Sequence, residues 1–237
     1  MNIFPRAAVA SLLLAAPVCA QEPETVTTAI LSYAPAPLPP DFSAFFKTGE
    51  SVFRFQPSPS NLGVPVVYTG LRRFVLRASE AEFGLPPEEL QLKPPLAFVD
   101  LPQKSDLVLI LAVPGDDGEV RLGAYNISSD SLREGDYRVF NFSSKAVSVI
   151  LGDQKFTVAP RKDKVVKDSK WHGETLALPL RIATVVNREV TPVYSSFWEH
   201  YPMRRNILFM FDGRHPTEPI VFSSFDAGTP PKTEAAQ

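Results

Sequence analysis

The chain has almost no cysteine and little histidine. Its single cysteine, Cys19, lies within the first twenty residues, and its three histidines are His172, His200 and His215. None of the histidines stands in an H-x-H or H-x-x-x-H pair, so a zinc or copper site would have to be assembled from distant loops. The lack of cysteine after residue 20 excludes disulfides, thiol nucleophiles and thiol redox chemistry from the rest of the chain.

Common sequence signatures of catalysis are also missing. There is no Gly-x-Ser-x-Gly elbow, no glycine-rich phosphate loop and no EF-hand-like run. The adjacent acids Glu88-Glu89 and Asp116-Asp117 have side chains that point apart, which favours loop positions over a glycosidase pair. We therefore expect a protein that is not an enzyme and carries no cofactor, with a carboxylate-dependent hydrolase as an alternative.

Neither sign of charge dominates. The 24 Lys and Arg residues face 26 Asp and Glu residues, for a formal net charge of −2. No global basic field is present to attract nucleic acid or an anionic membrane. A protein or a glycan is the partner that this composition leaves open.

The first twenty residues, MNIFPRAAVASLLLAAPVCA, have the pattern of a secretory signal peptide. Arg6 supplies the positive start, residues 7–16 form an apolar run, and Val18-Cys19-Ala20 ends it with small residues. The run is shorter than the roughly 20 residues that span a bilayer. Acylation of Cys19 is an alternative, but the residues before it fit a lipoprotein site poorly. We predict cleavage after Ala20 and export to the periplasm or the exterior.

Proline is abundant, at 24 residues, about twice the usual share of roughly 5%. Because proline breaks helices and cannot donate to a sheet ladder, its clusters mark loops and strand ends. Short apolar runs lie between them, at 25–33, 51–56, 65–70, 72–78, 96–101, 106–113, 119–127, 136–142, 146–152, 155–160, 176–186, 191–198, 206–211 and 218–225. This spacing predicts an all-β fold, an immunoglobulin-like antiparallel β-sandwich built as one sandwich or as two small packed β units.

The predicted organisation has four parts. They are a signal peptide at 1–20, a proline-rich segment with one strand at 21–50, the β-sandwich at 51–226 and a disordered tail at 227–237. The runs DLVLILAV and NILFMF do not alternate between apolar and polar, which is typical of strands covered on both faces. We place in the core Val108, Ile110, Val149, Phe156, Ile182, Leu208, Met210 and Val221.

Two loops concentrate the side chains that could bind a partner. The first loop, at 197–206, supplies Trp198, Tyr201, Arg204 and Arg205. The second loop, at 211–219, supplies Asp212, Arg214 and His215. Exposed aromatic rings stack on sugars and arginines grip carboxylates, so a carbohydrate-binding module is one alternative. The plainer alternative is that Trp198 caps the core and the charges are solvated.

Residues 119–160 and 192–211 resemble parts of uncharacterised bacterial exported β-sandwich proteins. The matching positions are Gly135, Tyr137, Arg138, Asn141, Ser143 and Ala159-Pro160. This resemblance implies an exported β-sandwich with no settled activity, so it transfers no catalytic residue. Asn141 and Ser143 suit a turn, which Phe140 and Phe142 would anchor by burial. We expect a non-catalytic binding or structural module of the cell envelope or the exterior.

The leader prediction can be checked directly. Protein expressed from the full-length gene in a bacterium and recovered outside the cytoplasm should begin at Gln21, as read by N-terminal sequencing. Recovery of the uncleaved chain in the cytoplasm would contradict it.

Overall fold

The computed structural model describes residues 24–115, 117–168, 171, 174–186, 189–215 and 218–228. Within them the fold is almost entirely β, and the predicted all-β, sandwich-like architecture is confirmed. The immunoglobulin-like topology stays a prediction. The predicted signal peptide and almost all of the predicted tail lie outside the described residues. No helix in the described part is long and apolar enough to cross a membrane.

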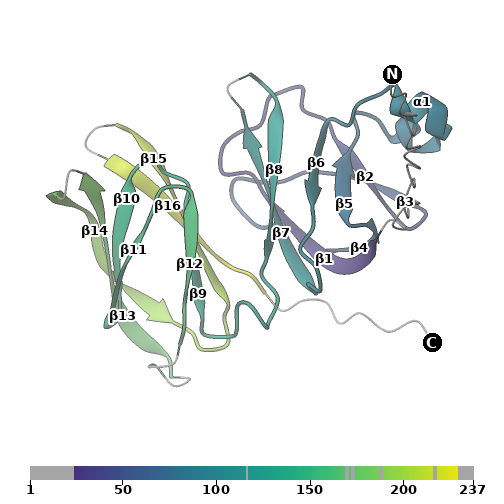
Figure 1. Ribbon diagram of the computed structural model, residues 1–237. Coiled ribbons are helices and arrows are strands. Elements are labelled where there is room, and N and C mark those ends of the chain that lie inside the picture. Colours follow the sequence, from purple (N-terminus) through teal and green to yellow (C-terminus); the bar gives the residue numbers. More distant parts are fainter. Residues whose placement is uncertain are drawn as a thin grey trace, which may run out of the picture.

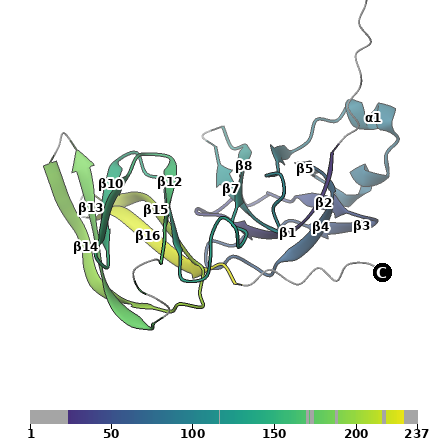
Figure 2. The ribbon, with the colours of Figure 1, turned by 60° about the horizontal axis from the view of Figure 1, so that its bottom comes forward.

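The strands fall into two lobes (Figures 1 and 2). The first lobe holds β1 (Thr25–Tyr33), β2 (Phe45–Thr48), β3 (Ser51–Arg54), β4 (Val66–Leu71), β5 (Arg73–Leu76), β6 (Ala97–Asp100), β7 (Leu107–Pro114) and β8 (Val120–Asn126), with the short helices η1 (Glu80–Gly84) and α1 (Pro87–Gln91). The second lobe holds β9 (Tyr137–Asn141), β10 (Ala146–Leu151), β11 (Gln154–Val158), β12 (Lys162–Val166), β13 (Leu176–Val186), β14 (Glu189–His200), β15 (Asn206–His215) and β16 (Glu218–Asp226).

Three four-stranded sheets form the frame. Sheet I has the order β4-β1-β7-β8, sheet II the order β12-β9-β15-β16, and sheet III the order β11-β10-β13-β14. Most neighbours are antiparallel, but β1 with β7 and β9 with β15 are parallel pairs. The hairpins β2-β3 and β5-β6 contribute to the core beside sheet I.

Burial on both faces explains the strands that do not alternate. In β7, Leu107, Leu109 and Leu111 join one hydrophobic core, whereas Val108 and Ile110 join the core beneath the hairpins. Strand β15 behaves in the same way between sheets I and III. Since alternate side chains of a strand point to opposite faces, each central strand contributes to two cores at once. The prediction of strands covered on both faces is confirmed for β7 and for the first half of β15.

An aromatic core joins the two lobes. Tyr33 of sheet I stacks on Phe209 of sheet II at 4.6 Å between ring centroids, and Phe225 packs against both rings. Phe140 adds a further contact to Phe209 at 5.3 Å. Tyr33, Phe140 and Phe209 are almost fully buried. The lobes therefore share one hydrophobic core in addition to their own.

Tight hairpins join β7 to β8 and β10 to β11. Pro114 pairs with Val120 across the first turn, and Leu151 pairs with Gln154 across a turn in which Gly152 has a positive φ of 61°. A side chain at Gly152 would also collide with Trp171, because an added Cβ would lie 2.8 Å from its ring. Glycine is therefore required here both by the turn and by the packing.

The predicted turn after β9 is also built as expected. The Asn141 side-chain oxygen accepts hydrogen bonds from the Ser143 backbone N–H at 3.0 Å and from its hydroxyl at 2.6 Å. The Asn141 side-chain amide donates to the carbonyls of Lys145 and Val158. This buried amide therefore ties the β9-β10 turn to the end of β11.

Two strands and one core position were predicted wrongly. The strands β2 and β12 were missed: β12 is rich in charge because it is the edge of sheet II, and β2 is a four-residue strand close to a proline cluster. Val221 was expected in the core but is 39% exposed, because it pairs with Phe211 where the first lobe no longer covers sheet II. The other seven predicted core residues are buried.

The shared aromatic core should dominate stability. We expect Phe209→Ala to lower the free energy of unfolding by about 3–5 kcal/mol, because it leaves a cavity in the core between the two lobes. Phe98→Ala, at a ring that is 54% exposed, is the control and should change it by about 1 kcal/mol or less. Urea denaturation followed by circular dichroism measures both. Equal losses in the two variants would contradict this role.

Candidate functional site

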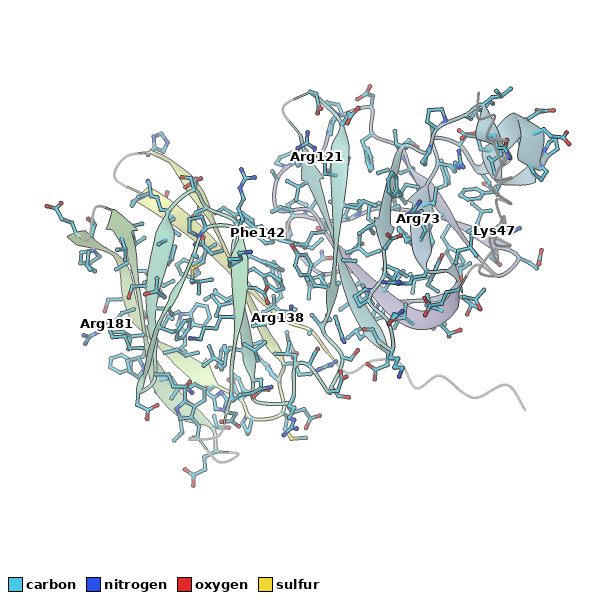
Figure 3. The ribbon with its side chains drawn as sticks, viewed as in Figure 1. Lys47, Arg73, Arg121, Arg138, Phe142 and Arg181 are labelled. Carbon is cyan, nitrogen blue, oxygen red and sulfur yellow. The ribbon has the colours of Figure 1, made fainter. Side chains whose placement is uncertain are left out.

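The aromatic column of the lobe junction continues past the buried core. Phe142 stacks on Phe140 at 5.8 Å and on Phe211 at 5.7 Å, and both Phe142 and Phe211 are only half-buried. The partly exposed Val221 lies beside Phe211 in the register. We call Phe142, Phe211 and Val221 the interlobe strip. It is an apolar surface on the face of sheet II that points to the first lobe, and Figure 3 shows Phe142 on that side.

Strand β8 faces this strip from the first lobe. Tyr125 packs edge-on against Phe140 at 4.8 Å, and Arg121, four residues earlier, lies on the same face of the strand. The Arg121 side chain is 72% exposed, and among the described residues its ion-pair partner is Asp117, at 3.5 Å. An exposed guanidinium therefore lies across from the apolar strip (Figure 3).

Arg138 connects the two lobes below the strip. Its Nε donates to the Asp163 carboxylate at 2.8 Å, and another guanidinium nitrogen donates to the Asn126 carbonyl at the end of β8. The guanidinium also lies over the rings of Tyr125 and Phe140. With only 13% of the side chain exposed, Arg138 is a structural clamp and not a free cation.

Arg205 forms a second clamp. Its guanidinium donates to the Ile127 carbonyl at 3.0 Å and to the Gly228 carbonyl. Burial lowers the pKa of Arg205, because the charged form loses solvation. Nearby, the Ser128 hydroxyl oxygen accepts hydrogen bonds from the backbone N–H groups of Asp106 and Leu107, at 3.0 and 3.1 Å. These bonds fix the connection between β8 and the second lobe.

The first predicted loop does not form one binding surface. Trp198 packs on the core of the second lobe beside Phe222, and its Nε1–H donates to the Tyr194 hydroxyl at 3.1 Å. Tyr201 lies past the end of β14, with the Arg204 guanidinium 4.2 Å from its ring centroid. No ring contact joins Trp198 to Tyr201 among the described residues. Arg205, from the same loop, is buried at the lobe junction.

The second predicted loop lies at the far end of the β15-β16 hairpin. Asp212 accepts hydrogen bonds from the Ser144 backbone N–H at 2.9 Å and from its hydroxyl at 3.0 Å. His215 is exposed and pairs with Glu218 in the register. Arg214 belongs to β15, but its side chain is outside the described part of the structure, as is all of His172. Asp212 therefore serves the hairpin contact with the β9-β10 turn.

A buried histidine is the polar feature that the sequence did not indicate. His200 ends β14 and is completely buried; its Nδ1 lies 3.1 Å from the Tyr137 hydroxyl and its Nε2 lies 3.5 Å from Asp168 Oδ1. Within the described part of the chain, His200 Nε2 and Asp168 Oδ1 have no hydrogen-bond partner. Trp171 packs edge-on against the imidazole. These groups come from the start of β9, the end of β14 and the segment after β12, so they meet only in the folded chain.

The segment that carries the Asp168 carboxylate, opposite His200, is held by Asp136, which directly precedes β9. The Asp168 backbone N–H donates to Asp136 Oδ1 at 2.9 Å, and Asp136 Oδ2 accepts from Lys167 Nζ at 2.9 Å. Gly135 leaves the space that Asp168 fills, since an added Cβ would lie 2.2 Å from Asp168 Oδ2. The segment after β12 is therefore fixed beneath the end of the second lobe.

In the described residues, no group of three or more His, Asp or Glu side chains has the arrangement of a metal site. Comparison with models of known protein families and with curated protein sequences finds no match. The interlobe strip is thus the surface that the geometry itself marks as a candidate site.

His200 should make stability depend on pH. Burial lowers its pKa from the ordinary value of 6.5, with Asp168 acting in the opposite direction. The unfolded chain then binds more protons below about pH 6.5, so stability is full above that pH and is lost as pH falls toward the lower folded pKa. Unfolding curves in urea between pH 5 and 8 should show this loss.

Two variants separate His200 from other titrating groups. His200→Gln should flatten the decline below pH 6.5, because the buried imidazole is gone. His215→Gln, at an exposed position, should keep the wild-type decline. If the loss of stability below pH 6.5 is unchanged in His200→Gln, a group other than His200 causes it.

Proposed function

We propose that the protein is an exported, non-catalytic binding module that holds a segment of a partner protein against the interlobe strip. The observation that carries the proposal is the aromatic column that leaves the buried core and ends in half-exposed Phe142 and Phe211. Exposed apolar side chains are common singly, but a contiguous group on a rigid frame is typical of an interaction surface. The signal peptide predicted at residues 1–20 supports export.

The chemistry of the strip favours an apolar segment with an acidic residue. Phe142, Phe211 and Val221 offer rings and a branched aliphatic group, which bury well against apolar side chains. Arg121 lies across from them with most of its side chain in solvent and one partner at 3.5 Å. Exchange of that weak surface ion pair for a carboxylate of the partner would lose little free energy.

The geometry gives less support to the carbohydrate-binding and hydrolase alternatives. Sugar stacking needs a free aromatic face, whereas Trp198 packs on the core and Tyr201 is covered by Arg204. A hydrolytic carboxylate needs free oxygens, whereas both oxygens of Asp212 accept hydrogen bonds from Ser144. Among the described residues, no hydrogen bond would have to be broken for a ligand to cover the interlobe strip.

Peptide selection tests the proposal. Random peptides displayed on phage and selected on the purified protein should converge on apolar sequences that include an acid. Val221→Asp places a charge in the strip at a position already 39% exposed, and should weaken binding of the selected peptides by about tenfold or more. Arg121→Glu should weaken peptides that contain an acid more than matched peptides that contain the amide.

The matched control is Leu92→Asp, an apolar residue that is 83% exposed and lies just after α1 in the first lobe. It should leave peptide affinity unchanged. Failure to select any peptide, or equal affinity for the Val221→Asp variant, would overturn the proposal. Turnover of sugars, esters or peptides by the purified protein would overturn its non-catalytic part.

A further inference from the structure

The outer face of sheet III is a second apolar surface, on the side of the second lobe away from the first. Phe197 is 72% exposed and pairs with Pro179, and Val190 is 61% exposed and pairs with Val185. Half-buried Ile150 lies on the same face of β10. An antiparallel sheet normally turns polar side chains to solvent, as Thr157 and Ser195 do here, so exposed Phe197 and Val190 depart from the usual pattern.

Few charges interrupt this face, and two of them lie on either side of Phe197. Arg181 pairs with Ser195 in the register, two residues from the row of Phe197 in one direction, and Glu199 lies two residues from it in the other. Arg181 has no ion pair or hydrogen bond in the described part of the chain, and Figure 3 shows it on the outer side of the lobe. Lys155 is the third charge, on the edge strand β11.

This arrangement is complementary to itself. A two-fold axis that lies across the strands at the row of Pro179 and Phe197 exchanges the row of Arg181 with the row of Glu199. It brings Arg181 of one copy over the end that carries Glu199 of the other, while Phe197 packs near the axis. An interface with two-fold symmetry requires this kind of self-complementary patch.

The face is large enough for a weak dimer. Strands β13 and β14 have 11 and 12 residues, whereas β10 and β11 have 6 and 5. At about 3.3 Å per residue and about 4.8 Å between strands, the sheet covers roughly 500 Å² before side chains are added, and the axis buries the part of it around the row of Phe197. Standard interfaces bury about 800 Å² on each partner, and weak, transient ones bury less. Pro192 lies in the edge strand β14 and cannot donate to a neighbouring strand, which favours packing through the face over pairing through the edge.

We infer that the protein forms a two-fold dimer through the outer face of sheet III, with Phe197 at its centre and reciprocal Arg181–Glu199 ion pairs. The inference stands apart from the proposed function, because the interlobe strip lies on a different sheet. In the dimer both strips stay open, so one assembly presents two equal binding surfaces. A partner with repeated segments would then bind with gained avidity.

Sedimentation velocity over a concentration series tests the dimer. The wild-type protein should sediment as a dimer at about 100 µM, where a micromolar Kd is detectable. Phe197→Asp should shift the protein to monomer at that concentration. Arg181→Glu should raise the dimer Kd about tenfold or more, since it places two acids together at each end of the interface.

A charge exchange makes the test specific. The double variant Arg181→Glu/Glu199→Arg restores opposite charges and should return the dimer Kd to within a few-fold of wild type. Each single variant should dimerise more weakly than the double variant. Val64→Asp, at a residue that is 84% exposed in the first lobe, is the control and should dimerise like wild type. Circular dichroism checks that each variant is folded.

Two results would overturn the inference. One is a wild-type protein that remains monomeric through the whole series. The other is a dimer that persists in Phe197→Asp, which would place the contact on another surface. Peptide binding to the interlobe strip is measured separately, so loss of either property does not imply loss of the other.

Discussion

The contact between Tyr33 and Phe209 is the constraint on which the rest of the molecule depends. It joins sheet I to sheet II, so both sheets are covered on two faces and their central strands must be apolar throughout. Without this shared core, Phe209 and the leucines of β7 would lie exposed on two separate sandwiches. The junction is therefore an integral part of the fold, and the angle at which it holds the lobes decides how much of sheet II stays open.

Polar groups complete the junction where apolar packing cannot specify direction. Arg138 and Arg205 each donate from the second lobe to a carbonyl at the end of β8. A buried arginine loses solvation, and apolar replacements often stabilise as well or better. Directed hydrogen bonds, however, fix one relative position, whereas rings can slide on each other. We infer that these clamps contribute more to the geometry of the interlobe strip than to the free energy of unfolding.

The strands were predictable because their signals are local. Proline clusters, glycine turns and apolar runs reveal where each strand begins and ends, and the unbroken runs in β7 and β15 reveal burial on both faces. The partners of those faces depend on contacts between distant segments. Arg205 and Val221 show the limit: the arginine chosen as a surface candidate is buried in the junction, while the valine expected in the core is exposed at its rim. His200 gave no signal, because Tyr137 and Asp168 reach it only after folding.

Most of the exposed apolar side chains of the second lobe fall into two groups, with Met203, after the end of β14, outside both. One group continues the shared core on sheet II, and the other lies on the outer face of sheet III with Phe197, on opposite sides of the same sandwich. No further layer covers the outer face of sheet III in the described structure, so that face would normally be polar. The face of sheet II that points to the first lobe is covered by that lobe, but only in part. In both places an ordered sheet carries partly exposed aromatic rings. Such surfaces lose little conformational entropy on binding, since the strands that carry them are already ordered. A module that uses one face to assemble and the other to bind is the arrangement that accounts for both groups with the same physical principle.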